Sequence, residues 1–285
     1  MIKYLMAASL SLAGCSSEKQ TISAPSPDLP DKPATAAPLS LYTFDCGSIE
    51  ISDLDAFSST GDYAGQTDKF TNTCYLIRHP QGDLLWDLGL PHALAGTEPQ
   101  TQDIFTISLE RTLIEQLAEI GLSAQDIEFI SISHSHFDHS GQAALFPDSQ
   151  WLVNRDEFDY MFSTDANRAQ NAAFADLSKS IFSGNHDVFG DGSVMILALP
   201  GHTPGHSALQ INLLESGPIL LTGDLYHRSE SRELKRVPRF NSDETQTRES
   251  MEVFETLARQ SGARVIIQHE PADVATLPKS PAFLR

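Results

Sequence analysis

The side chains best suited to chemistry gather in one short stretch, Ser131–Phe146, which is SISHSHFDHSGQAALF. It places His134, His136 and His139 around Asp138, although the whole chain of 285 residues has only ten histidines. Imidazoles and carboxylates contribute little to starting a strand or a helix, so local folding does not explain this spacing. Metal binding does, because neutral imidazoles and carboxylates are the ligands that a borderline ion such as Zn²⁺ takes.

Further polar side chains stand at the ends of apolar stretches, as His134 does. They are His202, Asp224 and His269. Each alone has an ordinary explanation. A single histidine after a strand is usually a surface residue, and an aspartate after a glycine, as in Gly223-Asp224, usually belongs to a turn. Such an explanation would have to apply separately to each of the four residues. A shared site explains them together, because strand ends on a rigid scaffold can direct ligands at one place. We therefore interpret the four residues as one site.

The spacing inside the cluster predicts two ions rather than one. His134 and His136 are two positions apart, so they project in related directions from an extended segment and can hold one ion. Asp138 and His139 lie on the turn beyond and reach a neighbouring position. Two ions about 3.5–4 Å apart can share a hydroxide at neutral pH and polarise the bond under attack. Zn²⁺ is the default from the ligand types, with manganese, cobalt and iron left open.

Apolar and amphipathic stretches alternate in the part of the chain that must position these residues. Strands are predicted at 73–79, 83–89, 127–133, 150–154, 194–199, 208–214, 218–224 and 263–269, and helices at 109–120, from 155 and at 244–260. Trp86 and Trp151 are expected in the core of their strands. Strands in two sets with helices between them predict an α/β fold of two packed sheets covered by helices on the outside.

Length and charge limit the classes of partner. The chain is long enough for one large domain or two small ones, and its 40% hydrophobic and 20% charged residues are typical of a globular protein. A formal net charge of −19 argues against nucleic-acid and anionic-membrane partners. The one basic patch, RELKRVPR from Arg232, is short and lies in an acidic neighbourhood.

The N-terminus predicts export. Residues 1–14 have an early lysine, an apolar run and a small-residue exit, as a secretory signal peptide has. Leu12-Ala13-Gly14-Cys15 resembles the lipobox of bacterial lipoproteins, which implies a lipid on Cys15; a plain signal with an incidental cysteine is the alternative. Residues 15–39 are rich in Pro, Ser and Ala and are expected to form a disordered tether. The prediction is a folded domain at 40–285, anchored in the periplasm or at the outer membrane.

Two cysteines, Cys46 and Cys74, remain in the predicted domain. In an oxidising compartment they can pair, but two buried thiols in neighbouring strands are an equal alternative. Pairing stays open on the sequence alone.

Taken together, these motifs resemble the metallo-β-lactamase superfamily over roughly Leu41 to the C-terminus, as one domain. The match rests on the 134–139 cluster, PGHTPGHS around His202, Gly223-Asp224 and His269. The resemblance implies an αββα sandwich, two mixed sheets flanked by helices, with a dinuclear site at one edge. It implies His134, His136 and His202 on the first ion, Asp138, His139 and His269 on the second, and Asp224 bridging both.

Two flanking stretches resemble the exported N-acyl homoserine lactonases, the quorum-quenching branch. They are CYLIRHPQGDLLWDLGLP from Cys74 and GDLYHRSESRELKRVPRFNSDETQTRESM from Gly223. This implies an acyl lactone substrate, attack by a metal-bridging hydroxide, and Asp138 as the nearest proton donor for the leaving ring oxygen. Known lactonases of this branch steady the carbonyl with a tyrosine shortly after the bridging aspartate. Tyr226 is the candidate here, with His227 and a merely packing Tyr226 as alternatives.

Two further expectations concern residues around the predicted ligands. His206 is expected beside the ligands rather than among them. Phe105 and Phe240 are candidates for an acyl-chain pocket. Two other functions stay open. One is another hydrolase of the same fold (a β-lactamase, an organophosphate hydrolase or a thioesterase), and the other is a surface lipoprotein that uses the ions structurally or binds a ligand without turning it over. The full ligand set argues against the last, because structural zinc is normally closed by four ligands.

Overall fold

The computed structural model describes residues 38–285. The predicted signal peptide, the predicted lipid attachment site Cys15 and nearly all of the predicted tether lie outside the described residues. Within 38–285, none of the helices has both the length and the apolar character that crossing a bilayer requires.

Two β-sheets form the centre of this part of the chain. The larger sheet has, in spatial order, β4 (Gln100–Gln102), β5 (Phe105–Ser108), β1 (Ser40–Ile51), β2 (Asp68–His79), β3 (Gly82–Trp86), β6 (Phe129–Ser131), β7 (Gln150–Asn154) and β8 (Lys179–Phe182), with β14 (Phe283–Leu284) beside β1. The smaller sheet has β13 (Arg264–Ile266), β12 (Gly217–Leu221), β11 (Ser207–Leu213), β10 (Val194–Ala198) and β9 (His186–Asp187). Both sheets are mixed. The pairs β3–β6, β6–β7, β7–β8 and β12–β13 are parallel, whereas pairs such as β2–β3 and β11–β12 are antiparallel.

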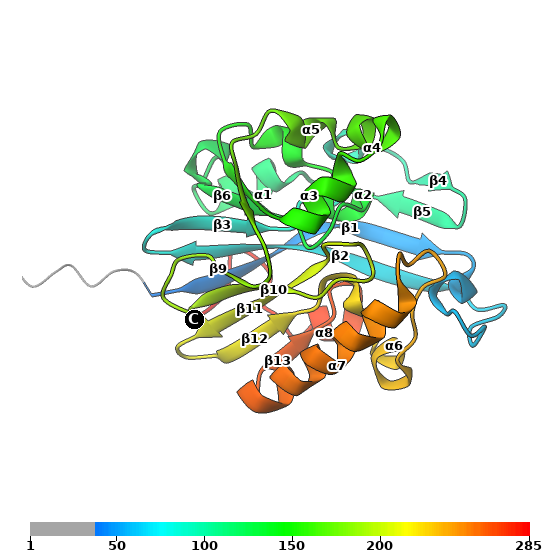
Figure 1. Ribbon diagram of the computed structural model, residues 1–285. Helices are drawn as coiled ribbons and strands as arrows, with labels where there is room; N and C mark the ends of the chain where they lie inside the picture. Colours follow the sequence, from blue (N-terminus) through cyan, green and yellow to red (C-terminus); the bar gives the residue numbers. More distant parts are fainter. Residues whose placement is uncertain (1–37) are drawn as a thin grey trace, which may run out of the picture. The chain divides into compact units, whose positions relative to one another are not determined.

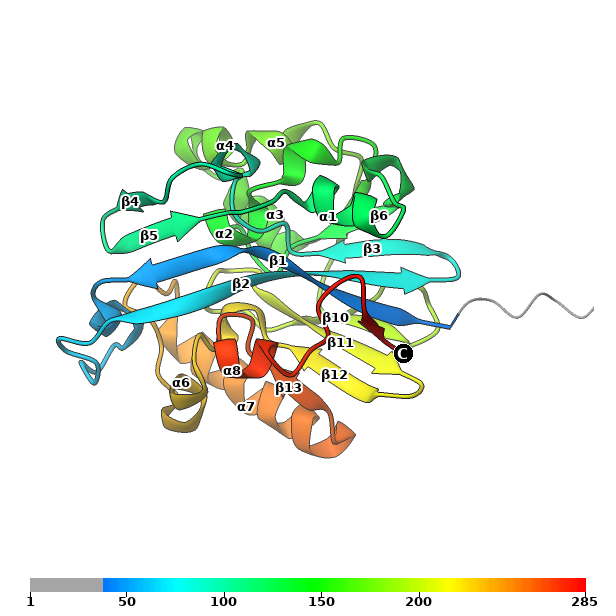
Figure 2. The same cartoon turned by 180° about the vertical axis from the view of Figure 1, so that it is seen from behind.

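Helices cover the outer face of each sheet (Figures 1 and 2). On the side of the larger sheet lie α1 (Leu113–Glu119), α2 (Phe137–Ser140), α3 (Arg155–Met161), α4 (Asp165–Gln170) and α5 (Ala172–Ala175). On the side of the smaller sheet lie α6 (Ser229–Leu234), α7 (Glu244–Ser261) and α8 (Pro271–Val274). Short 3₁₀ turns occur at η1 (Leu54–Phe57), η2 (His92–Leu94), η3 (Ala124–Asp126), η4 (Ala143–Leu145) and η5 (Gly223–Leu225). The predicted αββα sandwich is confirmed.

The core has one layer between the sheets and one under each set of helices. Trp86 packs between the sheets among aliphatic side chains of both, such as Ile77 of the larger sheet and Leu209 of the smaller one. Trp151 packs on the other face of the larger sheet, with its ring centroid 4.6 Å from that of Phe174 in α5. Both tryptophans are fully buried, as predicted.

The disulfide left open by the sequence is present. Cys46 in β1 and Cys74 in the adjacent β2 are bonded, with Cα atoms 5.8 Å apart, and both are fully buried. The neighbouring turn packs tightly onto this bond, because a Cβ on Gly89 would lie 2.9 Å from Sγ of Cys46. The bond therefore joins the two longest strands of the larger sheet.

Candidate metal centre

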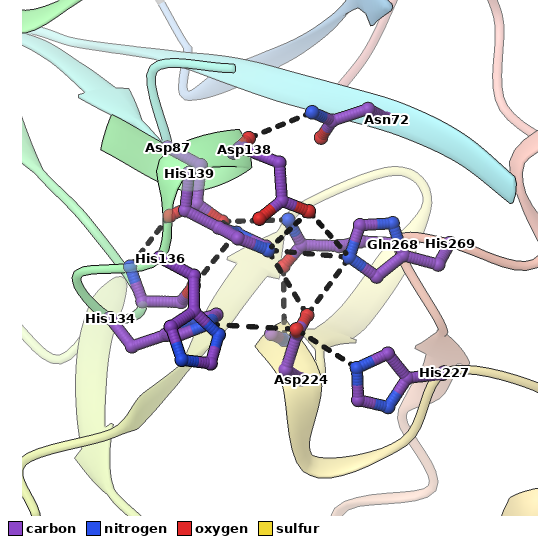
Figure 3. A network of polar contacts seen from close by, with 12 residues as sticks. Asn72, Asp87, His134, His136, Asp138, His139, Asp224, His227, Gln268 and His269 are labelled. Carbon is purple, nitrogen blue, oxygen red and sulfur yellow. Dashed lines mark hydrogen bonds and ion pairs between the residues drawn. The ribbon is translucent and has the colours of Figure 1, made fainter. Parts of the chain in front are cut away.

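The seven predicted metal ligands meet in one cluster, and Figure 3 labels all of them except His202. It contains two groups, His134, His136, His202 and Asp224 in one, and Asp138, His139 and His269 in the other. In each group the possible ligand atoms lie within 4.8 Å of one another. The chain delivers them from four places: the loop after β6 with α2, the loop between β10 and β11, η5 after β12, and the loop after β13. These groups are the two ligand sets that the family resemblance implies.

The carboxylate of Asp224 lies between histidines of the first group and histidines of the second. Its Oδ2 is 3.5 Å from Nε2 of His134 and 3.4 Å from Nε2 of His202. Its Oδ1 is 3.1 Å from Nε2 of His139 and 3.0 Å from Nε2 of His269. Each oxygen therefore faces one group, which is what a carboxylate shared by two ions requires.

Burial and charge set the protonation of the histidines. Burial, with neighbouring imidazoles adding to it, lowers the pKa of His134 and His136 well below the usual value. Both are therefore neutral at pH 7, the form that binds a metal ion. Burial also lowers the pKa of His139, but the carboxylates of Asp224 and Asp138 outweigh it and the net pKa is raised. The field of these carboxylates thus favours positive charge in the second group.

Two buried polar atoms of the cluster have no hydrogen-bond partner, and a metal ion would supply one. Within residues 38–285, Nε2 of His134 and Oδ1 of Asp224 are buried and make no hydrogen bond of good geometry. Leaving a buried polar atom unpaired costs about 1–3 kcal/mol, so such atoms need a further ligand. Imidazole nitrogens and carboxylate oxygens at this spacing are a donor set suited to Zn²⁺. The residues present therefore fit two divalent ions.

Asp87, which was not predicted from the sequence, braces the second group from behind. It is fully buried, with a left-handed φ of 58°. Its Oδ1 accepts a hydrogen bond from the amide of Ser133 at 2.6 Å, and its Oδ2 accepts one from Nε2 of Gln268 at 2.7 Å. Oδ2 also lies 3.1 Å from Nδ1 of His139. A carboxylate behind a metal-binding histidine fixes the ring and raises its basicity.

His206 holds the backbone of Asp224, consistent with its expected place beside the ligands. Its Nδ1 donates to the carbonyl of Leu199 at 2.9 Å, and its Nε2 accepts from the amide of Asp224 at 3.0 Å. Burial lowers the pKa of His206 to about 3, so Nε2 carries no proton and is free to accept. The imidazole therefore fixes the residue that faces both groups.

Tyr226 lies outside the cluster, which corrects its predicted catalytic role. Its ring is buried in the core under α7, and its hydroxyl donates to Oε1 of Glu255 at 3.1 Å. His227 enters the site instead, with Nε2 3.0 Å from Oδ2 of Asp224 and its ring stacked on that of His269. The reason is local: Tyr226 is extended, with φ −140° and ψ 138°, and successive side chains of an extended segment point to opposite sides.

An aromatic pocket opens onto the cluster. Its apolar walls are Ile49, Ile51, Phe57, Phe70, Phe105, Phe137 and Phe240, and its polar floor is His136, Asp138, Asp224, His227 and His269. Phe57 in η1 and Phe240 in the loop before α7 meet edge to face, with ring centroids 5.2 Å apart. Phe137 and Phe240 remain 37% and 43% exposed. Phe105 and Phe240 thus line a pocket, as expected, and its lining combines polar groups for a polar head with apolar groups for an apolar chain.

Comparison with known families gives one match that covers most of the chain. Residues 67–269 match the model of the metallo-beta-lactamase superfamily. Among curated proteins, the N-acyl homoserine lactonase AttM of Rhizobium johnstonii is 28% identical over 225 residues, which cover 73% of this chain and 85% of the relative. AttM of Agrobacterium fabrum is 29% identical over the same shares.

Solved structures show the same fold. A quorum-quenching N-acyl homoserine lactone hydrolase superposes with a TM-score of 0.76 at 24% identity, covering 86% of this chain and 98% of the other. AidC, a dizinc quorum-quenching lactonase bound to its product, superposes with a TM-score of 0.65 at 19% identity, covering 86% and 93%. At these identities the likeness establishes the fold alone.

Proposed function

The chain belongs to the metallo-β-lactamase superfamily, and on that premise we propose that it is a hydrolase with two divalent ions, most simply Zn²⁺, that opens the lactone ring of N-acyl homoserine lactones. The observation that carries the proposal is an aromatic pocket with metal-ligand side chains on its floor. Histidines of the first group lie beside Oδ2 of Asp224, and histidines of the second group lie beside its Oδ1. The relatives named as lactonases support this choice of substrate.

The polar floor of the pocket would bind the polar part of the substrate, and its apolar walls would bind the apolar part. When bound, the ions would supply a nucleophile from water and withdraw charge from the ester carbonyl. Asp224 would hold the two ions together, and its amide and carboxylate are fixed by the neighbouring histidines. The lactone head would lie on this floor while the acyl chain contacts the phenylalanines, which exclude water from the head.

Two residues of the floor are placed to assist at the reacting atoms. His227 faces the pocket beside Asp224 and would donate a hydrogen bond to the carbonyl oxygen as its charge grows. Asp138 lines the same floor with its carboxyl 3.5 Å from Nε2 of His139. It would take the proton that the attacking water gives up and pass it to the ring oxygen as the C–O bond of the lactone breaks. This gives His227 the task that the sequence suggested for Tyr226.

The test is hydrolysis of defined acyl lactones, followed by mass spectrometry. Opening the ring adds one water to the mass, and the proposal requires that gain in the presence of Zn²⁺. A panel with nitrocefin, a thioester and a phosphotriester separates this substrate from the other hydrolase reactions. Faster turnover of any of these than of every lactone would refute the proposed substrate and leave the hydrolase site.

We also propose that the domain works outside the cytoplasm, tethered through Cys15. The buried Cys46–Cys74 disulfide supports export, since structural disulfides persist in oxidising compartments. Cell fractionation with and without Cys15→Ser tests the anchor: the wild-type chain should be found with membranes and the variant should be soluble. A wild-type chain found in the cytoplasm would contradict the proposal.

A further inference from the structure

Glu157 is a buried acid that has no part in the chemistry proposed above. It is the third residue of α3, and only 2% of its surface is exposed. Burying a carboxylate is unfavourable unless hydrogen-bond donors surround it. Its position in the first turn of a helix helps, because the helix dipole favours negative charge there. The remaining stabilisation must come from its contacts.

The carboxylate accepts three hydrogen bonds from two different loops. Oε1 accepts from the amide of Ser135 at 2.7 Å. Oε2 accepts from the hydroxyl of Thr203 at 2.7 Å and from the amide of Gly205 at 3.0 Å. All three donors are buried, so little water competes for these bonds. One side chain thus links two segments that are far apart in the sequence.

These two segments carry all three histidines of the first group of predicted metal ligands. Ser135 lies between His134 and His136, and Thr203 follows His202 directly. The three histidines are the whole imidazole set of the first group. A shift of either segment relative to α3 would therefore change the spacing of the ligands of one ion.

Close packing leaves these segments little freedom to adjust. A Cβ on Gly205 would lie 2.1 Å from the backbone nitrogen of Glu157, so this loop rests directly on the first turn of α3. That turn is itself fixed by Asn154, whose side chain accepts from the amide of Asp156 at 2.9 Å. The first turn of α3 therefore fixes the position of the Glu157 carboxylate, and the carboxylate fixes the two loops that donate to it.

The second half of the site is braced by other residues. Its contacts are Asp87 Oδ2 with Nδ1 of His139 at 3.1 Å, the Thr71 carbonyl with Nδ1 of His269 at 2.8 Å, and Nδ2 of Asn72 with the Asp138 carbonyl at 2.7 Å. Glu157 takes part in none of these hydrogen bonds. The two groups share one contact residue, Ser133, whose Oγ lies 3.1 Å from Nδ1 of His134 and 3.1 Å from Nδ1 of His139. Glu157 itself bonds only to the two segments that carry the histidines of the first group, so its loss should affect one ion more than the other.

We propose that Glu157 is a positioning residue that sets the spacing of His134, His136 and His202 and thereby controls the affinity of one of the two ions. The inference rests on the ion pair of the proposed function and not on its substrate. The physical reason is that ligands fixed in advance bind an ion more tightly than ligands that must be ordered on binding.

Glu157→Gln is the matched substitution. Glutamine has the same shape, but its NH₂ group would face a donor where the carboxylate accepts, so at least one loop loses its hold. Stripped full-length protein is titrated with Zn²⁺ against a chromophoric chelator. The wild type should bind two equivalents. In the variant one equivalent should keep its affinity and the other should bind about 10–100-fold more weakly, the usual effect of removing such a support.

Glu255→Gln is the control. Glu255 is held by Arg232 and Tyr226 outside the cluster, so its loss should lower thermal stability and leave both affinities unchanged. If Glu157→Gln lowers stability while both Zn²⁺ affinities stay at the wild-type values, or if both fall equally, the proposal is overturned. Should that variant fail to fold, Thr203→Val removes one donor to the same carboxylate. It should weaken the same single equivalent, and unchanged binding would overturn the proposal as well.

The outcome separates this inference from the proposed reaction. A wild-type chain that binds two ions but opens no lactone would refute the proposed substrate and leave the role of Glu157 standing. A wild-type chain that binds two equivalents, together with a Glu157→Gln titration equal to that of the wild type, would refute the role of Glu157 and leave the proposed substrate standing. A wild-type chain that binds no Zn²⁺ would end both.

Discussion

At the scale of single residues, His227 and Tyr226 are adjacent in the chain and face different surroundings. His227→Phe keeps an aromatic ring beside His269 but removes both ring nitrogens of a residue that lines the pocket. The value of kcat/KM for an acyl lactone should fall about 10²-fold, a typical loss when a donor to the developing oxyanion is removed. Steady-state kinetics measure this, and the metal content of the same sample is needed because His227 contacts Asp224.

The control for that prediction is Tyr226→Phe. It removes only the hydrogen bond to Glu255, so kcat/KM should stay at the wild-type value while stability falls by about 1 kcal/mol. If Tyr226→Phe were the inactive variant and His227→Phe the active one, the tyrosine would regain the role first predicted for it.

The sequence indicates ligands more readily than their supports, and the reason is locality. His134, His136, Asp138 and His139 form a dense motif that has no ordinary explanation. Glu157 is instead one acid in the first turn of a helix, a common place for an acid, and its partner Ser135 lies 22 residues away. Asp87 likewise follows a strand and acts on residues that only the fold brings near. Supports of this kind have no local signal.

At the scale of elements, two segments form the rim of the pocket. The segment 52–67, which contains η1, carries Phe57, and the loop 235–243 carries Phe240. Ion pairs join them, Asp55 with Arg239 and Asp62 with Arg236. The backbone does so too, through the amide of Arg239 and the carbonyl of Ala56 at 2.8 Å. The aromatic wall thus depends on contacts between the two segments.

Arg239→Gln should loosen this wall without touching the metal cluster. An exposed ion pair contributes up to about 1 kcal/mol, so KM for a long-chain acyl lactone should rise by at most about fivefold. For a short-chain lactone, which contacts fewer phenylalanines, the change should be smaller. Kinetics across an acyl series measure this, and 0.5 M NaCl should reduce the difference between the proteins by screening. An equal rise in KM for all chain lengths would contradict the prediction.

The pair Arg232–Glu255, which joins α6 to α7, predicts a pH dependence of stability. Two nitrogens of Arg232 donate to the carboxylate at 2.7 and 3.0 Å, and these hydrogen bonds lower the pKa of Glu255 despite its partial burial. A carboxyl whose pKa is lower in the folded state stabilises the fold above its unfolded pKa of about 4.5. That contribution is lost as pH falls through the folded pKa.

Glu255→Gln should therefore lower Tm at pH 7, and the difference from the wild type should shrink as the pH falls below about 4.5. Thermal melts of both proteins at pH 7, 5 and 3.5 measure it, if both still unfold reversibly at the lowest pH. A difference that stays constant from pH 7 to pH 3.5 would show that the charge of Glu255 contributes nothing.

Element boundaries were predictable where caps or turns mark them. The helix predicted at 244–260 spans Glu244–Ser261, between the cap Asp243 and the left-handed Gly262. The helix predicted from Leu109 begins only at Leu113, because Thr112 and Glu115 form a capping box that starts it there. No strand was predicted for β1, although it pairs with β2 along its length. Its register shifts between Asp45 and Ser48, which interrupts the alternation that marks a strand.

At the scale of the whole molecule, the site depends on how the two sheets meet. The ligands in the loop after β6 and in α2 follow a strand of the larger sheet, whereas His202, Asp224 and His269 follow strands of the smaller one. The layers were predictable from the alternation of strands and helices. The strand order was not, because pairing β3 with β6 or β12 with β13 joins segments separated by tens of residues. Sequence patterns record local preference and contain no such pairing.

Ions held between the sheets should therefore stabilise the whole fold. Removing them by dialysis against a chelator leaves buried imidazoles and carboxylates without their partners and frees the loops of both sheets. A ligand at about 1,000 times its Kd adds about 4 kcal/mol, which corresponds to roughly 10 °C in Tm for a domain of this size. Calorimetry of the stripped protein should show a fall of at least that order, restored by Zn²⁺ and not by Mg²⁺, which prefers oxygen ligands. An unchanged Tm after verified removal of metal would mean that the two sheets hold together, and hold the cluster, without any ion between them.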